Sequence, residues 1–188
     1  MSGAHGAENP ILFYRLIYQF RFILVSLNIG AILQEATIYQ RREILSKMTP
    51  GLGLDDAEGA TIERLTAQGG DKSRLGMGAL MWISHAERPL MADELCNALA
   101  IELGSPDFNA SNIPPITTLL SCCQGLITVE KGASTVRLIH FTLKEYLSAH
   151  SDIFSRPYSA MAEICLTYLN SQQVKALPAW CDTYTFAP

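Results

Sequence analysis

The sequence predicts a mainly α-helical chain with one small two-stranded β-hairpin, and three observations support this fold class. Apolar residues recur three and four positions apart through most of the 188 residues, which is the spacing of amphipathic helices. Clusters of proline and glycine divide these runs into segments of helical length. Residues 126–141, in contrast, begin with the alternation of half-buried strands.

Five helices are predicted before the hairpin. The first ends at the break Thr49–Leu54, which contains Pro50 and two glycines. Asp55 is expected to cap the second helix, and Asp71 or Ser73 the third, because a short polar side chain accepts from the free N–H groups of a first turn. The apolar stripe of the third helix, expected to be core, consists of Leu75, Ala79, Trp82 and Ile83. The five segments are 32–48, 55–70, 71–87, 91–103 and 115–124.

The predicted hairpin pairs Leu126–Glu130 with Val136–Phe141 across a turn-like segment. The string "VRLIHFTLKEYL" then changes from the period of a strand to that of a helix, with His140 at the change. Two more helices are expected, at 142–154 and 159–177. Three short helices followed by a hairpin is the order of a winged helix, here flanked by a helical scaffold.

The composition argues against nucleic acid and anionic lipid as partners, and it favours a reducing compartment. The net charge is −4, so there is no general attraction to nucleic acid or to anionic lipid. The cysteines are odd in number and lack C-x-x-C spacing, which argues against a disulfide framework or a zinc site. Most are expected to be small apolar core residues of a reducing compartment, so the cytoplasm is predicted. They are Cys96, Cys122, Cys123, Cys165 and Cys181.

One apolar segment, Ile11–Leu33, is long enough to raise the question of a membrane helix. It carries Arg15 and Arg21 near its middle, and each arginine at the centre of a bilayer costs about 2.5–3.5 kcal/mol. A helix covered by protein is therefore expected, not a membrane anchor.

Three strings carry a resemblance to a known family: "SRLGMGALMWISHAERPLMADELCNALA", "NIPPITTLLSCCQGLITVEKGASTVRLIHFTLKEYLSAH" and "AEICLTYLN". They resemble the region after the ATPase core in fungal NACHT proteins of the STAND class, signalling ATPases that often end in ankyrin repeats. The same module is similar to the winged helix behind GPI inositol-deacylase-like hydrolase domains. The resemblance implies a winged-helix domain at 71–150, a helical lid or linker at 22–70 and a following helical segment at 151–177. Residues 1–21 match neither family, and 178–188 are expected to form an unstructured tail.

The chain departs from both families in its catalytic motifs. No G-x-x-x-x-G-K-[ST] string occurs, and the nearest, Gly69–Ser73 or "GGDKS", has Asp71 where the phosphate loop requires glycine. No G-x-S-x-G nucleophile elbow occurs either. We therefore predict a chain without catalytic residues, a non-catalytic regulatory module from the interior of a larger protein. No cofactor is expected, and ADP or ATP would bind only with a P-loop from a partner or from upstream sequence.

By resemblance, His140 stands where animal NACHT receptors place a histidine that contacts the phosphate of bound ADP, and Lys144 replaces the usual glutamine. The alternative is a histidine that closes the hairpin core or bonds a helix N-terminus. A metal site of His140, Glu145 and His150 is not expected, because spacings of five do not share one helix face. A nucleophile at Cys122 or Cys123 is not expected either, because no nearby charge lowers a thiol pKa.

Winged helices often bind DNA through their third helix, which needs basic or amide side chains. The segment Ser111–Val129 contains no charged residue, and the hairpin offers only Lys131 and Arg137. Nucleic acid is therefore not expected as a partner. The expected partners are protein domains, in particular a NACHT ATPase core, ankyrin repeats or homologous chains.

Overall fold

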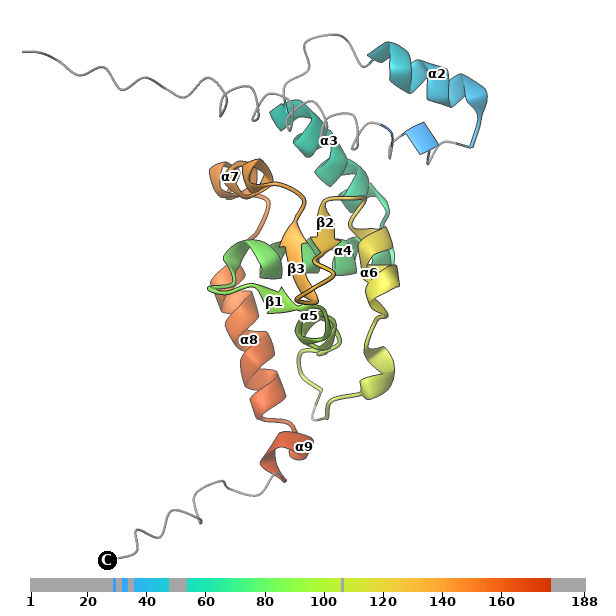
Figure 1. Cartoon of the computed structure of the whole chain (residues 1–188). Coiled ribbons are helices and arrows are strands. Elements are labelled where there is room, and N and C mark those ends of the chain that lie inside the picture. Colours follow the sequence, from blue (N-terminus) through green and yellow to red (C-terminus); the bar gives the residue numbers. More distant parts are fainter. Residues whose placement is uncertain (1–28, 30–31, 34–35, 48–53, 106, 177–188) are drawn as a thin grey trace, which may run out of the picture.

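The computed structural model describes residues 29, 32–33, 36–47, 54–105 and 107–176, and it confirms the mainly helical fold class (Figure 1). The helices are α2 (Ile38–Lys47), α3 (Leu54–Ala67), α4 (Gly70–His85), α5 (Ala92–Leu99), α6 (Ile116–Cys122), α7 (Phe141–Ala149), α8 (Pro157–Leu169) and α9 (Gln172–Lys175). The strands are β1 (Leu90–Met91), β2 (Ile127–Val129) and β3 (Thr135–Leu138), and a 3-10 turn, η1, spans Ala110–Asn112.

The sheet has three antiparallel strands in the order β1-β3-β2, one strand more than the predicted hairpin. Val136 of β3 lies opposite Val129 of β2 and Leu90 of β1. Pro89 restricts the backbone before it to extended conformations, which favours a strand at β1. Two residues are too few to alternate visibly, so the sequence carries no signal for this strand.

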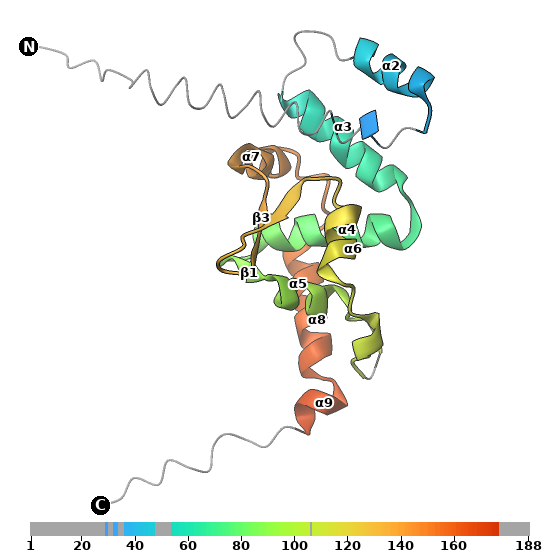
Figure 2. The same cartoon turned by 45° about the vertical axis from the view of Figure 1, so that its right-hand side comes forward.

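Helix α4 lies at the centre of the domain and contacts α3, α5, α6, α8 and β3 (Figures 1 and 2). Of its predicted apolar stripe, Leu75, Ala79 and Trp82 are buried, and Ile83 packs half-buried against the same core. This core also includes Ile62 and Leu65 of α3 and Leu143 and Leu147 of α7. Helix α3 therefore packs as part of the winged-helix core, although the prediction places it in the linker at 22–70.

Several predicted boundaries were wrong. The N-cap of α4 is Gly69 with φ +68°, while Asp71 lies in the first turn, 3.3 Å from Arg74. Asp55, predicted as a cap, lies inside α3. The strand predicted to reach Phe141 ends at Leu138, because the chain turns into α7. The predicted helices 91–103 and 159–177 are shortened to α5 and divided into α8 and α9.

Apolar side chains remain exposed on α2 and α8. Helix α8 buries none of its side chains fully, and Tyr158, Leu166 and Leu169 remain exposed, as do Ile38 and Tyr39 of α2. No helix among the described residues is long and apolar enough to cross a membrane. The segments 1–21 and 178–188 and most of Ile11–Leu33 lie outside those residues. The predicted domain division stays a prediction.

Glycine at two positions of α4 lets its neighbours approach closely. A Cβ at Gly76 would lie 2.9 Å from the Cys122 carbonyl oxygen and 3.0 Å from a Leu65 methyl group. A Cβ at Gly78 would lie 2.7 Å from a methyl group of Leu99, a side-chain atom that can move aside. The backbone carbonyl beside Gly76 cannot move without moving α6. Gly76 is therefore the position that sets the distance between α4 and α6.

Replacing Gly76 with alanine is expected to lower the free energy of unfolding by about 1–3 kcal/mol, the usual cost of overpacking a core. The loss should appear although alanine favours an isolated helix by up to about 1 kcal/mol. Gly132→Ala is the matched control, because nothing lies within 4 Å of its added Cβ. Urea unfolding of both variants checks this, and equal stability of Gly76→Ala and wild type would contradict the packing described.

Candidate functional site

His140 lies between β3 and α7, at the joint where the sequence changes period. Its backbone is extended, with φ −152°, and it is the N-cap of α7. Its Nδ1 lies 3.0 Å from the Thr142 hydroxyl and 3.4 Å from the Thr142 backbone nitrogen. Both contacts of Nδ1 are therefore made at the N-terminal end of α7.

The hydrogen bonds continue from Thr142 into α3. The Thr142 hydroxyl donates to Oε1 of Glu58 at 2.9 Å, and both side chains are buried, at 8% and 1% exposure. We call the series His140–Thr142–Glu58 the α3–α7 link. A buried carboxylate is costly unless hydrogen bonds satisfy it, so the link favours one placement of α3 on α7. Sequence reasoning missed Glu58, because it lies 84 positions from Thr142.

A second contact supports the same placement. A Cβ at Gly59 would lie 2.8 Å from the Tyr146 hydroxyl oxygen, so the absence of a side chain at Gly59 admits the tyrosine. Helices α3 and α7 lie side by side at the same end of the domain in both views (Figures 1 and 2). Glu58 and Gly59 thus give consecutive contacts to the first and second turns of α7.

His140 is also one of the residues that line a hollow of about 280 Å³. Its lining comes from the C-terminal end of α4, the segment 86–89, β1, β3 and the start of α7. Ile83, Leu90, Val136, Leu138 and Phe141 supply its apolar part, and Glu87, Arg88, Arg137 and Lys144 its charged part. Three of the four charged residues are cations.

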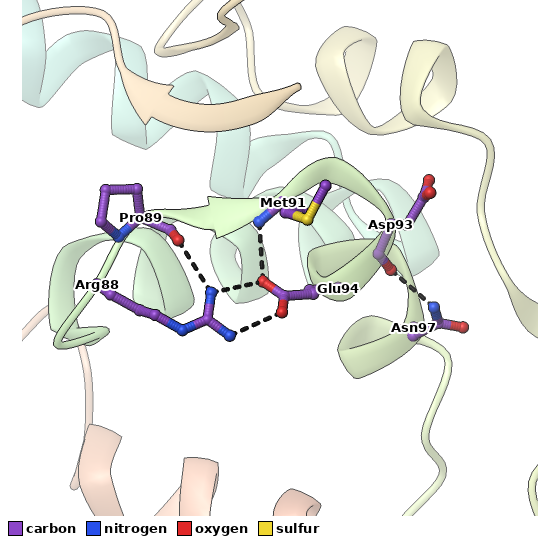
Figure 3. A network of polar contacts seen from close by, with 6 residues as sticks. All are labelled: Arg88, Pro89, Met91, Asp93, Glu94 and Asn97. Atoms are coloured by element: carbon purple, nitrogen blue, oxygen red, sulfur yellow. Dashed lines mark hydrogen bonds and ion pairs between the residues drawn. The ribbon is translucent and has the colours of Figure 1, made fainter. Parts of the chain in front are cut away.

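Two of these cations are held by carboxylates outside the hollow. Arg88 forms a two-pronged ion pair with Glu94 at 2.7 and 2.9 Å, as Figure 3 shows. Its guanidinium, together with the Met91 N–H, holds the pKa of Glu94 down to about 2. Arg137 pairs with Glu130 at 2.6 Å. Within the described part of the chain, Lys144 forms no ion pair, so its charge is available to a ligand.

Burial lowers the pKa of His140, and the nearby Glu145 carboxylate opposes that effect. Since its ordinary value is near 6.5, the ring is neutral at pH 7. Nδ1 is engaged by Thr142, and the described residues offer Nε2 no hydrogen bond. Nε2 is therefore the ring nitrogen that a bound molecule can reach.

The other sequence candidates lie elsewhere. His150 is the C-cap of α7, at the end opposite His140, where its Nδ1 bonds the Tyr146 carbonyl at 2.9 Å and its ring stacks on Tyr146. The predicted absence of a metal site stays a prediction, and among the described residues no group of three potential ligands is brought together. Cys122 and Cys123 are buried, and burial, with a smaller effect of Cys122, raises the pKa of Cys123 to about 12.

The third helix of the module, α6, presents hydroxyl groups instead of charges. Thr117, Thr118 and Ser121 are its exposed polar side chains, while Leu119 and Cys122 are buried against the core. Readout of base edges in the major groove relies chiefly on basic or amide side chains. This face offers neither.

Helices α4, α5 and α6, together with a small antiparallel sheet whose first strand lies between α4 and α5, define the class of protein as a winged-helix domain. Helices α3 and α7 pack against it, and the hollow lies beside His140. The family model of the GPI inositol-deacylase winged helix domain matches residues 62–159, more than half of the chain. The chain belongs to this family. No curated protein and no solved structure gave a significant match. The module that the resemblance implied is thus confirmed, while the NACHT context stays a prediction.

The cysteines are expected to differ sharply in reactivity. Because only the thiolate is nucleophilic, Cys123 should resist alkylation by iodoacetamide in the folded protein, whereas the exposed Cys165 should react readily. Peptide mass mapping after a short exposure near pH ~8 separates the sites. Labelling of Cys123 as fast as that of Cys165 would show that the α4–α6 contact opens.

Proposed function

We propose that the chain is a non-catalytic regulatory and interaction module, the winged-helix portion of a STAND/NACHT-type signalling protein. The observation that carries the proposal is that His140 and Lys144 line the same hollow, where Lys144 forms no ion pair with the described residues. An ammonium group donates to a phosphate, and an imidazole does so through a ring nitrogen that carries a proton. The proposed ligand is the terminal phosphate of a nucleotide, presented by a nucleotide-binding domain.

In this proposal the chain supplies part of a site and not a whole one. It contains no phosphate-binding loop of its own, so its contribution is a donor set at His140 and Lys144. Occupation of the hollow would favour one placement of the winged helix on its partner domain, and an empty hollow would release it. Such nucleotide-dependent rotation of one domain against another is a common switching motion.

The partners we propose are protein domains: a NACHT ATPase core, ankyrin repeats or homologous chains, met in the cytoplasm. The exposed apolar side chains of α2 and α8 support a protein partner, because exposed apolar patches mark interaction sites. The uncharged face of α6 and the net charge of −4 give a nucleic acid little to bind. A role within a GPI inositol-deacylase-like hydrolase is the other candidate, favoured by the family match. Its catalytic serine would have to lie in another domain.

We expect ADP to bind the purified chain weakly, and binding to fall at least threefold in His140→Ala and Lys144→Glu, since each change removes a phosphate donor. Lys131→Glu is the matched control, because it makes the same charge change at the exposed turn of the hairpin, outside the hollow. Titration calorimetry at low salt measures all four proteins.

Two outcomes would count against the proposal. If Lys131→Glu weakens ADP binding as much as Lys144→Glu, the attraction is general charge and not a site. If ADP does not bind wild type while duplex DNA does, with an affinity that falls steeply as salt is added, the nucleic-acid alternative replaces it.

A further inference from the structure

The α3–α7 link contains a proton whose position the sequence cannot show but the geometry constrains. Thr142 has one hydroxyl proton, which it donates to Glu58 Oε1 at 2.9 Å. The Thr142 oxygen then has no proton left for His140. The 3.0 Å contact between that oxygen and Nδ1 therefore requires the proton of the imidazole to be on Nδ1.

One contact competes with this arrangement. The Thr142 backbone N–H points to Nδ1 at 3.4 Å, and it could bond only an Nδ1 that carries no proton. That distance lies beyond the usual range for N–H donors, whereas 3.0 Å lies within it. The Thr142 hydroxyl also lies 2.9 Å from Oε1 of Glu58, closer than to Nδ1, so the geometry places its proton on the side of Glu58.

We propose that Glu58 and Thr142 are positioning residues that hold His140 in its Nδ1–H tautomer, so that the neutral ring offers a lone pair at Nε2 to the hollow. A neutral ring in this tautomer repels a phosphate oxygen. It accepts from a donor instead, or becomes a phosphate donor once Nε2 takes up one proton from solvent. Binding of a fully ionised phosphate at this site, which rests on the proposed function, is then coupled to uptake of that proton.

The sign of the coupling follows from the charges around the ring. Burial keeps free His140 neutral near pH 7, while a bound anion stabilises its imidazolium form. Above the pKa of free His140, affinity for an anion should therefore fall about tenfold per pH unit. The charged groups that face the ring or line the hollow are Glu58 from α3, Glu87 and Arg88 before β1, Arg137 from β3, and Lys144 and Glu145 from α7.

The first test is the tautomer itself, read from long-range proton–nitrogen NMR spectra of the full chain near pH ~7.5. His85 and His150 are internal references, because the Nδ1 of each lies within 3.0 Å of a backbone carbonyl oxygen and must donate to it. His140, assigned by its loss in His140→Ala, should give the same Nδ1–H pattern. An Nε2–H pattern for His140 would overturn the proposal whatever binds in the hollow.

Two variants then test the positioning role. Thr142→Val keeps the shape of the side chain and removes its hydroxyl, so His140 should change to the Nε2–H tautomer while His85 and His150 keep theirs. Thr142→Ser restores the hydroxyl and should restore Nδ1–H. A merely structural role of Thr142 would leave the tautomer unchanged in Thr142→Val. If Thr142→Val does not fold, the spectra of wild type and of Thr142→Ser still show which ring nitrogen of His140 carries the proton.

The coupling is tested with sulfate, a phosphate analogue whose charge is constant between about pH 5.5 and 8. Sulfate should raise the pKa of His140 and bind more weakly as pH rises. Sulfate binding that does not change with pH would overturn the coupling. A failure of sulfate to bind at any pH would refute the anion site of the proposed function, while the tautomer assignment would stand on its own spectrum.

Discussion

The close approach of α4 to its neighbours is the constraint on which the rest of the structure depends. Helices α3, α5, α6 and α8 and strand β3 all contact this helix, and Gly76 lets the carbonyl group of Cys122 and the methyl groups of Leu65 occupy the space of a side chain. The positions of α3 and α6 follow from that packing. The sheet then rests on α4 through β3, which brings the segment after α4 to the same edge as His140. The hollow is thus a consequence of how the core packs.

The α3–α7 link adds a polar constraint to this apolar one. A buried carboxylate without hydrogen bonds costs several kcal/mol as an order of magnitude. Arrangements in which α3 moves away from Thr142 while Glu58 stays shielded from water are therefore unfavourable. The same carboxylate connects α3 to the ring that lines the hollow. Events at the hollow and the placement of α3 therefore share one set of hydrogen bonds. In the proposed function, these hydrogen bonds would couple a ligand near His140 to the placement of α3.

Periodic, apolar features could be predicted from the sequence, and contacts between distant residues could not. The stripe of α4, the two paired strands and the place of His140 follow from local spacing. Strand β1 could not be predicted because two residues show no periodicity. The N-cap of α4 could not be predicted because Gly69 caps the helix through its backbone and not through a side chain. Glu58 gave no local signal, since its partner lies in another helix and an acid in a helix is usually exposed. Three cysteines are buried as expected, but Cys165 lies on the exposed side of α8.

The central claim is that α3 and the winged helix form one cooperative unit held together by the core and by the α3–α7 link. Native-state hydrogen exchange of the full chain tests it directly, because amides that open only by global unfolding share one free energy of opening. We expect the amides of Ile62–Ala67 in α3 to share that free energy with those of α4 and α7. Exchange of α3 at a much lower free energy, with α4 still protected, would show that α3 detaches on its own and would contradict the account.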